Sequence, residues 1–286
     1  MSGTWVFVVG WILLPAGLGA LWWWTLAFST GARLPLAGLM VTQGMAWAGR
    51  YMPGKAGLVI AKLTVAREAG TSWRLLGRTV LAEQILFIIA GLCFAFVFLP
   101  FDAQWLHRLG DSWLSGSMLS SLSEGNQWFW RSLAIALLVG GGWLALAVST
   151  RMLSLPRLQT TRLKWALVLC GHFLLHLLVG LAVYPLLSAM LPIAAGELGV
   201  LGVAAVFALA NCAGILAIIA PAGLGVREAV LALCLSHGAG FDAALAVAAW
   251  VRVLTLIADG AFSGLAISAG WLLGRKNAAV EGPDQS

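Results

Sequence analysis

The chain of 286 residues is 61% hydrophobic and only 10% charged, with a mean hydropathy of +0.94. So few charged side chains cannot cover the surface of a water-soluble globule, and the sequence therefore predicts an integral membrane protein. The net charge of +6 does not indicate nucleic-acid binding, because the basic residues concentrate in two segments beside apolar runs, as in cytoplasmic loops.

Five apolar runs are long enough to cross the hydrocarbon core, which requires about 20 helical residues each. In chain order they are residues 5–28, 75–100, 128–150, 163–191 and 243–273. None alternates apolar and polar residues with a period of two, so all are predicted to be helices. Two shorter apolar stretches, 36–52 and 201–220, each end directly before a proline. The predicted fold class is all-α, a polytopic membrane helix bundle.

The two short stretches belong to a pattern that occurs twice, 168 positions apart. Residues 43–70 and 211–238 each contain an apolar segment, a break at proline and glycine, and a second segment that carries charge. The matching residues are Gln43 with Asn211, Pro53 with Pro221, Gly57 with Gly225, Ala61 with Ala229, Leu63 with Leu231, and Gly70 with Gly238. Broken hydrophobic segments at corresponding places in two halves of a chain point to a transporter binding site. The repeat halves are expected at about 33–100 and 201–273.

The charges of the loops give the expected orientation. The segment 151–164 is basic and contains no acid, so it is predicted to be cytoplasmic. The same side is predicted for the basic residues Lys55, Lys62, Arg67, Arg74 and Arg78. Three predicted spans separate the broken segments, and an odd number reverses the direction of the second copy. The sequence therefore predicts two re-entrant segments in an inverted repeat, with breaks that meet near the middle of the membrane.

An alternative topology lets 201–220 cross the membrane completely. It would place the basic pair Arg275 and Lys276 outside, against the charge rule, so the re-entrant arrangement is preferred. In either topology residues 1–276 form a single transmembrane domain. The polar tail 277–286 is predicted to be disordered.

At each break one helix must stop and another begin. Lys55 and Gly57 lie at the first break, and Gly223, Gly225 and Arg227 lie at the second. A new helix starts with unpaired N–H groups and the positive end of its dipole, which is a ready site for an anion. The alternative interpretation is a pair of helix kinks whose basic side chains reach the headgroups.

Five ionisable residues lie within apolar runs, where a charge facing lipid is costly. They are Glu83, Arg227, Glu228, Arg252 and Asp259. Arg252 and Asp259 are seven residues apart and are predicted to share one helix face. Under the 168-residue offset Arg252 corresponds to Gln84, which is next to Glu83 in the sequence. We therefore expect Arg252 to approach Glu83 near the breaks. Either these charges bind the phosphate of a ligand, or they are structural ion pairs between helices. The candidate substrate-binding residues are Lys55, Gly57, Glu83, Gly223, Gly225, Arg227, Glu228, Arg252 and Asp259.

Metal, cofactor and catalytic motifs do not emerge from the sequence. His172 and His176 lie four apart on one helical face, and two bundle-facing histidines explain this spacing better than a metal site without a third ligand. The four cysteines are scattered singly. No metal, cofactor or catalytic residue is therefore predicted.

The residues at the two breaks resemble a known family. Residues 53–57 (PGKAG), Arg67, Gly70 and Glu83 in the first half, and residues 221–229 (PAGLGVREA) with Arg252 in the second, resemble a flippase-like integral membrane family. That family is related to the membrane flippase domain of lysylphosphatidylglycerol synthetases. The resemblance covers residues 33 to 273, and the stretch GLGVREA is its most specific part.

The resemblance implies a multi-pass protein of the bacterial inner membrane that translocates an anionic phospholipid or a polyprenyl-linked lipid, or assists its translocation. The chain departs from the family by lacking a further N-terminal helix and a C-terminal acyltransferase domain, so synthesis of lysyl lipid is not expected. The expected partners are membrane lipid and enzymes of lipid synthesis, with no nucleic acid. Two other functions compete with transport: a membrane enzyme that modifies a lipid headgroup, and a non-transporting partner of a lipid-synthesis complex.

Overall fold

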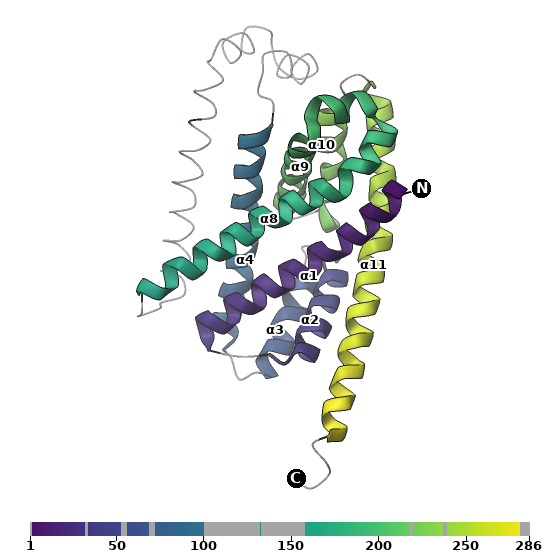
Figure 1. The fold of residues 1–286 in the computed structure, drawn as a ribbon. Helices are drawn as coiled ribbons and strands as arrows, with labels where there is room; N and C mark the ends of the chain where they lie inside the picture. The colour runs from purple at the N-terminus through teal and green to yellow at the C-terminus, as the bar shows by residue number, and fades with distance from the viewer. Residues whose placement is uncertain are drawn as a thin grey trace.

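A computed structural model describes residues 2–31, 34–52, 56–68, 72–99, 132, 158–217, 220–236 and 239–280. Over these residues the protein is a helix bundle without strands (Figure 1). Its elements are α1 (Ser2–Thr30), α2 (Leu36–Gly49), α3 (Ala56–Glu68), α4 (Trp73–Phe98), α8 (Leu158–Met190), α9 (Pro192–Leu216), the 3₁₀ turn η2 (Pro221–Gly223), α10 (Val226–Leu235) and α11 (Phe241–Val280).

The predicted long helices are confirmed where the structure describes them. Within the described part, five helices are long and apolar enough to cross a membrane: Gly3–Ser29, Leu76–Phe98, Leu163–Met190, Pro192–Leu216 and Phe241–Arg275. They indicate a multi-pass membrane protein. The predicted span 128–150 lies outside the described residues, apart from residue 132. Helix α11 continues to Val280, so the first part of the segment predicted to be disordered is helical.

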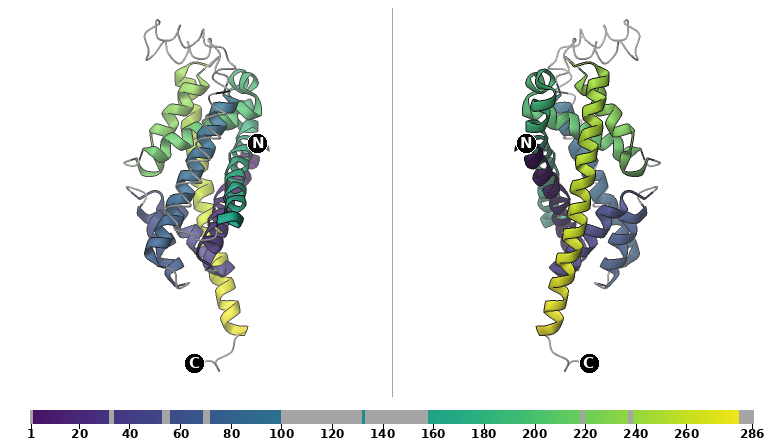
Figure 2. Two further views of the ribbon diagram at one scale, coloured as in Figure 1. Left: turned by 90° about the vertical axis from the view of Figure 1, so that its left-hand side faces the viewer. Right: turned by 90° about the vertical axis from the view of Figure 1, so that its right-hand side faces the viewer.

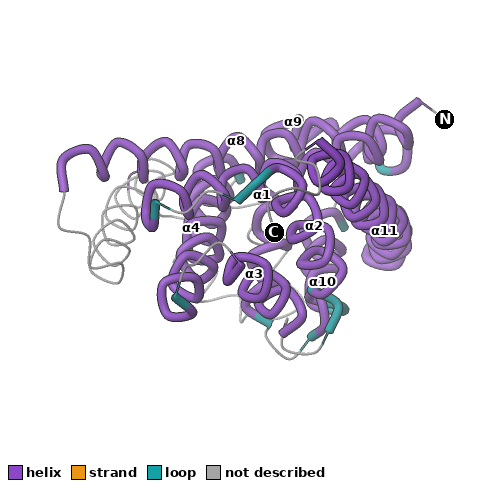
Figure 3. The backbone as a smooth tube through the Cα atoms, turned by 90° about the horizontal axis from the view of Figure 1, so that it is seen from below, coloured by secondary structure: helices purple, strands orange, loops and turns teal. Residues whose placement is uncertain are grey.

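Long helices α1, α4, α8 and α11 form the bundle together with two helix pairs. In Figure 1, α1 and α8 run side by side at a slant, whereas α4 and α11 run nearly vertically. Helices α2 and α3 form a first helix pair, and α9 and α10 form a second helix pair. Figure 2 shows the two pairs at opposite ends of the molecule, with the end of α2 and the start of α10 facing each other at mid-height. Seen from below, α3 and α10 lie on the side opposite α8 (Figure 3).

The packing of the two pairs is reciprocal. Helix α2 of the first pair packs along α11, and α9 of the second pair packs along α4. The central part of α9 is rich in alanine and is fully buried, which brings its backbone close to α8. A Cβ on Gly180 of α8 would lie 2.7 Å from the Cα of Ala204, so glycine is required at this crossing.

Glycine also closes each helix pair. A Cβ on Gly57 would lie 2.7 Å from the Cα of Gly49, so α3 crosses α2 with backbones in contact. In the second pair a Cβ on Gly223 would lie 2.5 Å from the Cα of Gly214. Gly223 also has a φ of 71°, which L side chains rarely adopt. Helix α9 is itself interrupted at Gly199, whose φ is 60°.

Candidate functional site

A cavity of about 90 Å³, partly open to the surroundings, lies between the two helix pairs. Both pairs contribute to its walls, together with α1 and α4. It is lined by Trp11, Leu14, Leu18, Trp47, Arg50, Leu58, Gln84, Phe87, Asn211, Gly214, Ile215, Ala222 and Arg227. The wall therefore joins residues on both sides of the two predicted breaks.

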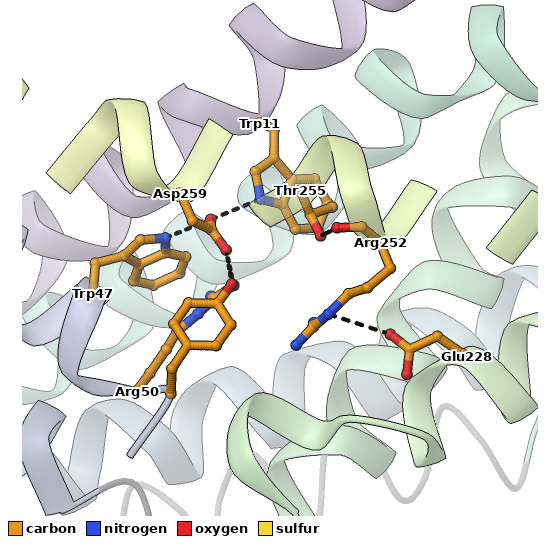
Figure 4. Close-up of polar contacts among 8 residues, drawn as sticks. Trp11, Trp47, Arg50, Glu228, Arg252, Thr255 and Asp259 are labelled. Atoms are coloured by element: carbon orange, nitrogen blue, oxygen red, sulfur yellow. Dashed lines mark hydrogen bonds and ion pairs between the residues drawn. The ribbon is translucent and has the colours of Figure 1, made fainter. Parts of the chain in front are cut away.

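Asp259 of α11 holds the end of α2 beside this cavity (Figure 4). Its Oδ1 accepts hydrogen bonds from the indole N–H groups of Trp11 at 3.1 Å and Trp47 at 2.7 Å. Its Oδ2 accepts from the Arg50 guanidinium and the Tyr51 hydroxyl. Four donors from α1 and from the α2 region thus converge on one buried carboxylate. Such a carboxylate is fully satisfied, so it is suited to holding helices together rather than to binding a further ligand.

Arg252 lies on the same side of α11 as Asp259, which confirms the predicted shared face. Its guanidinium is 5.6 Å from the Tyr51 ring, and its Nε is 3.6 Å from Oε1 of Glu228. That distance is too long for a hydrogen bond. All three guanidinium nitrogens of Arg252 are buried and have no hydrogen-bond partner. Arg252 is therefore a charged donor with unused hydrogen-bonding capacity.

Arg227 reaches the cavity from the first turn of α10 and is also buried. Its guanidinium lies 4.8 Å from the Trp11 ring and 5.9 Å from the Phe207 ring. Its Nε and Nη2 atoms have no hydrogen-bond partner. Aromatic rings on its faces fix the plane of the guanidinium and leave its edge free for a ligand.

A side chain of α10 itself accepts one of the backbone N–H groups at the start of this helix. The backbone N–H of Gly225 donates to Oε2 of Glu228 at 2.7 Å, and Gly225 has a φ of 85°. The expectation of free N–H groups at this break is therefore wrong for Gly225. Glu228 divides its two oxygens between this cap and Arg252. The arginine side chains, rather than the helix end alone, are what this break offers to an anion.

The charges around the cavity do not balance. Arg227 lines the cavity, and among Arg227 itself and the described charges that act on it, three guanidinium groups face two carboxylates, which leaves one excess positive charge. The three are Arg50, Arg227 and Arg252, and the two are Glu228 and Asp259. Buried charges are normally paired and hydrogen-bonded, because an unpaired charge in a dry interior costs several kcal/mol. An anion that enters the cavity would correct both the charge and the missing hydrogen bonds.

The predicted approach of Glu83 to Arg252 is wrong. Glu83 of α4 instead pairs with Lys62 of α3, with Lys62 Nζ 2.5 Å from Glu83 Oε2. Both side chains are almost completely buried, and the Lys62 ammonium also lies 4.6 Å from the Trp22 ring. The sequence analysis assigned Lys62 to the cytoplasmic side and did not predict its burial. The Lys62 ammonium contacts the Glu83 carboxylate directly and neutralises it. Glu83 therefore has no net attraction for the more distant Arg252.

Of the other predicted residues, one lies outside the described part of the chain, and the rest have roles in packing or at a helix start. Lys55 lies outside the described residues. Gly57 and Gly223 are packing positions at the crossings within the helix pairs, and Gly225 is the residue that precedes α10. His172 and His176 face the bundle interior as predicted: His172 Nδ1 lies 2.8 Å from Val168 O, and His176 Nε2 lies 3.3 Å from Phe87 O.

Arg50, Tyr51, Trp11 and Trp47 are site residues that the sequence analysis missed. The signal for Arg50 was present, because it is a charged residue within the short apolar segment just before the first break. The tryptophans carry no such signal, since a tryptophan in an apolar helix has many roles. In the described part of the chain, no group of three or more His, Cys, Asp and Glu side chains is placed to hold a metal ion.

Comparison of the chain with protein-family models, with curated proteins and with solved structures found no match.

Proposed function

We propose that this protein is a transporter of the bacterial inner membrane that translocates an anionic phospholipid or a polyprenyl-linked lipid. In this proposal the phosphate of the headgroup enters the central cavity and binds between Arg227 and Arg252. The single observation that carries the proposal is the unused hydrogen-bonding capacity of these two buried guanidinium groups.

Phosphate suits this pair for geometric reasons. A guanidinium donates two parallel hydrogen bonds to a phosphate or carboxylate, and each such charge-assisted bond is about twice as strong as a neutral one. A tetrahedral phosphate has enough oxygens to accept from both arginines at once. The excess positive charge around the cavity favours an anion over a zwitterion of the same size.

The arrangement of the helices supports an inverted repeat with re-entrant pairs. Under the 168-residue offset α2 corresponds to the second part of α9, α3 to α10, and α4 to α11. The reciprocal packing of α2 on α11 and of α9 on α4 is what a twofold relation between the halves produces. Helix α9 is long enough in total to cross a membrane, but its interruption at Gly199 leaves residues 200–216 as the continuous part, which is at the lower limit of about 17 residues for a full span. We therefore propose that both pairs enter the membrane from opposite sides and turn back at its middle.

A lipid is favoured over a soluble anion by the rim of the site. The breaks carry exposed apolar side chains, namely Met52 at the first break, and Leu216 and Leu224 at the second. These side chains lie on segments that bound the cavity, and Arg50 and Arg227 are the arginines in its wall. Exposed leucine and methionine beside a polar cavity suit a ligand whose headgroup is inside while its chains stay in the hydrocarbon.

Transport follows from exchange of partners at Arg252. When the phosphate binds, it competes with Glu228 for the guanidinium, because Glu228 contacts Arg252 only at 3.6 Å. Weakening that contact loosens the second helix pair from α11, to which it is otherwise joined by packing. A ligand shifts the equilibrium between the attached and the loosened second helix pair only if it binds one of these states more tightly. In this proposal the phosphate binds the loosened state more tightly, because Arg252 is then free of Glu228.

The proposal is tested with purified protein in liposomes that contain a fluorescent phosphatidylglycerol or phosphatidylcholine. A membrane-impermeant quencher reports how much label is exposed on the outer leaflet with time. The wild-type protein is expected to equilibrate the anionic lipid faster than protein-free liposomes and faster than the zwitterionic lipid. Arg227→Gln and Arg252→Gln are each expected to slow the anionic lipid by about tenfold or more, which corresponds to one lost hydrogen bond to a charged group.

Arg74→Gln is the matched control, because Arg74 is an exposed arginine at the start of α4. It is expected to equilibrate the anionic lipid as the wild type does. If wild-type protein moved neither lipid, transport would be rejected. Chemical change of the labelled headgroup in the same samples would then favour a lipid-modifying enzyme.

A further inference from the structure

The most deeply buried ion pair of the described chain lies outside the proposed lipid site. Lys62 and Glu83 tie α3 of the first helix pair to α4, and both side chains are at most 3% exposed. Ionisable residues within membrane helices are costly, and they often form proton pathways in pumps and transporters. The proposed lipid site does not include this ion pair. Lipid binding therefore does not explain why two costly charges are buried between α3 and α4.

The surroundings of the pair contain further polar atoms without partners. The indole Nε1 of Trp22 and the imidazole Nε2 of His172 are buried and have no hydrogen-bond partner. His172 Nδ1 lies 2.8 Å from the Val168 carbonyl and therefore carries the proton, so its Nε2 is a free acceptor. A free indole donor beside Lys62 and a free imidazole acceptor on the neighbouring helix suit a water molecule or a proton path.

The helices that pack against α4 place buried titratable groups around it. Helix α3 supplies Lys62, α8 supplies His172 and His176, and α9 supplies the Cys212 thiol, which lies 3.5 Å from the Ile88 carbonyl. Helix α1 contains no titratable residue. Glu83 is the carboxylate that pairs with Lys62. These helices carry two further carboxylates, Glu68 as the last residue of α3 and Glu197 at an exposed position of α9.

We propose that Glu83 is the site at which this transporter binds a coupling proton, and that protonation releases the first helix pair from α4. The proposal rests on the proposed transport function. The proton comes from the aqueous phase and forms an O–H bond on the Glu83 carboxylate, and no electrons are exchanged. The ion pair is lost, while Lys62 keeps its charge and its contact with the Trp22 ring 4.6 Å away. That ring stabilises the cation left behind.

The second helix pair has a related contact of reversed polarity. There, Glu228 of α10 faces Arg252 of α11. Under the 168-residue offset these positions are close to, but not the same as, those of Lys62 in α3 and Glu83 in α4. Each pair is therefore held to the helix that follows it by one ion pair. In the second pair the cation is on the long helix and an anionic lipid competes for it. In the first pair the anion is on the long helix and a proton competes for it. The two ligands would thus act on opposite pairs.

Infrared difference spectroscopy of the protein in liposomes between pH 8 and pH 5, about the range in which a perturbed carboxyl group titrates, tests proton binding directly. Wild-type protein is expected to show the carbonyl stretch of a protonated carboxyl group that is missing from Glu83→Gln. The double variant Glu83→Gln with Lys62→Met removes both charges, so it keeps the test valid if the single variant misfolds. Glu197→Gln, at an exposed position of α9, is the control and should retain the band.

The second measurement is lipid distribution under a pH gradient. One unit of gradient shifts the final ratio of labelled phosphatidylglycerol between leaflets by up to about tenfold if one proton moves with each lipid. The wild type should show this shift, and the double variant should equilibrate the lipid to equal amounts. The proposal is overturned if no band depends on Glu83, or if both proteins respond equally to the gradient. Transport without a gradient tests the lipid proposal separately, and the infrared result decides on the proton site even if no lipid moves.

Discussion

Arg252 and Asp259 lie on one side of α11, about two helical turns apart, and contact different helix pairs. Asp259 accepts hydrogen bonds from Arg50 and Tyr51, which follow α2. Arg252 faces Glu228 at the start of α10. Helix α11 thus contacts the first pair through a satisfied carboxylate, and the second through a guanidinium with free donors. An anion is therefore expected to act first on the second pair.

Asp259→Asn is expected to destabilise the protein strongly. The change removes the charge that balances Arg50 and replaces one accepting oxygen by an NH₂ group, a donor that faces other donors, so a buried cation loses its partner. Breaking one side of such a pair costs about 3–5 kcal/mol. Thermal unfolding in detergent measures the loss. Asp242→Asn, at an exposed position in the first turn of α11, should cost less than about 1 kcal/mol. Equal effects of the two substitutions would contradict the role given to Asp259.

The Lys62/Glu83 pair is expected to show strong coupling in a double-mutant cycle. Lys62→Met or Glu83→Gln alone leaves one buried charge without its partner, at a cost of about 3–5 kcal/mol. The double variant leaves no charge and should cost much less than the sum of the single variants. Unfolding in detergent, followed by tryptophan fluorescence, provides the measurement. Additive losses would show that the two residues do not stabilise each other.

Gly223→Ala is expected to distort the second break. The added methyl group would meet the Gly214 backbone, and the positive φ disfavours alanine, with a combined cost of about 1–3 kcal/mol. Gly260→Ala on α11 is the matched control, because a Cβ there meets nothing within 4 Å. It should stabilise the helix by about 0.5–1 kcal/mol. If Gly223→Ala were as stable as the control, the close contact between α9 and η2 would be wrong.

The long helices were predictable from the sequence because length and hydropathy alone define them. The predicted spans 5–28 and 75–100 agree with α1 and α4 to within a few residues at each end. The pairing of charges was not predictable in the same way. The repeat placed Glu83 beside the position equivalent to Arg252, but it says nothing about which charge lies nearest in space, and Lys62 on the adjacent helix is nearer.

The charge rule also gave no indication that Lys62 is buried. That rule counts basic residues near the ends of spans, so it cannot distinguish a lysine at the surface from one on the inner face of a short helix. Lys62 is 2% exposed. Hydrogen bonds from Trp11 and Trp47 to Asp259 were equally beyond prediction, because they join residues more than 200 positions apart. Only the packing of α1, α2 and α11 brings them together.

Labelling of single cysteines tests the proposed inverted topology. Arg74 and Asp242 are 168 positions apart, at the starts of α4 and α11, and both are exposed. In a background without the native cysteines, Arg74→Cys and Asp242→Cys are expected to react with a membrane-impermeant maleimide from opposite sides. Opposite sides follow from re-entrant pairs that enter from the two faces. Labelling from the same side would mean that α9 crosses the membrane completely.

The most direct measurement is an experimental structure of the protein in a lipid disc that contains phosphatidylglycerol. The account predicts density for the lipid phosphate within hydrogen-bond distance of both Arg227 and Arg252, with its acyl chains leaving between the two breaks. Glu228 should then lie farther from Arg252 than the present 3.6 Å. A structure with bound lipid only at the outer surface, and with both guanidinium groups still without an anion, would contradict the central claim.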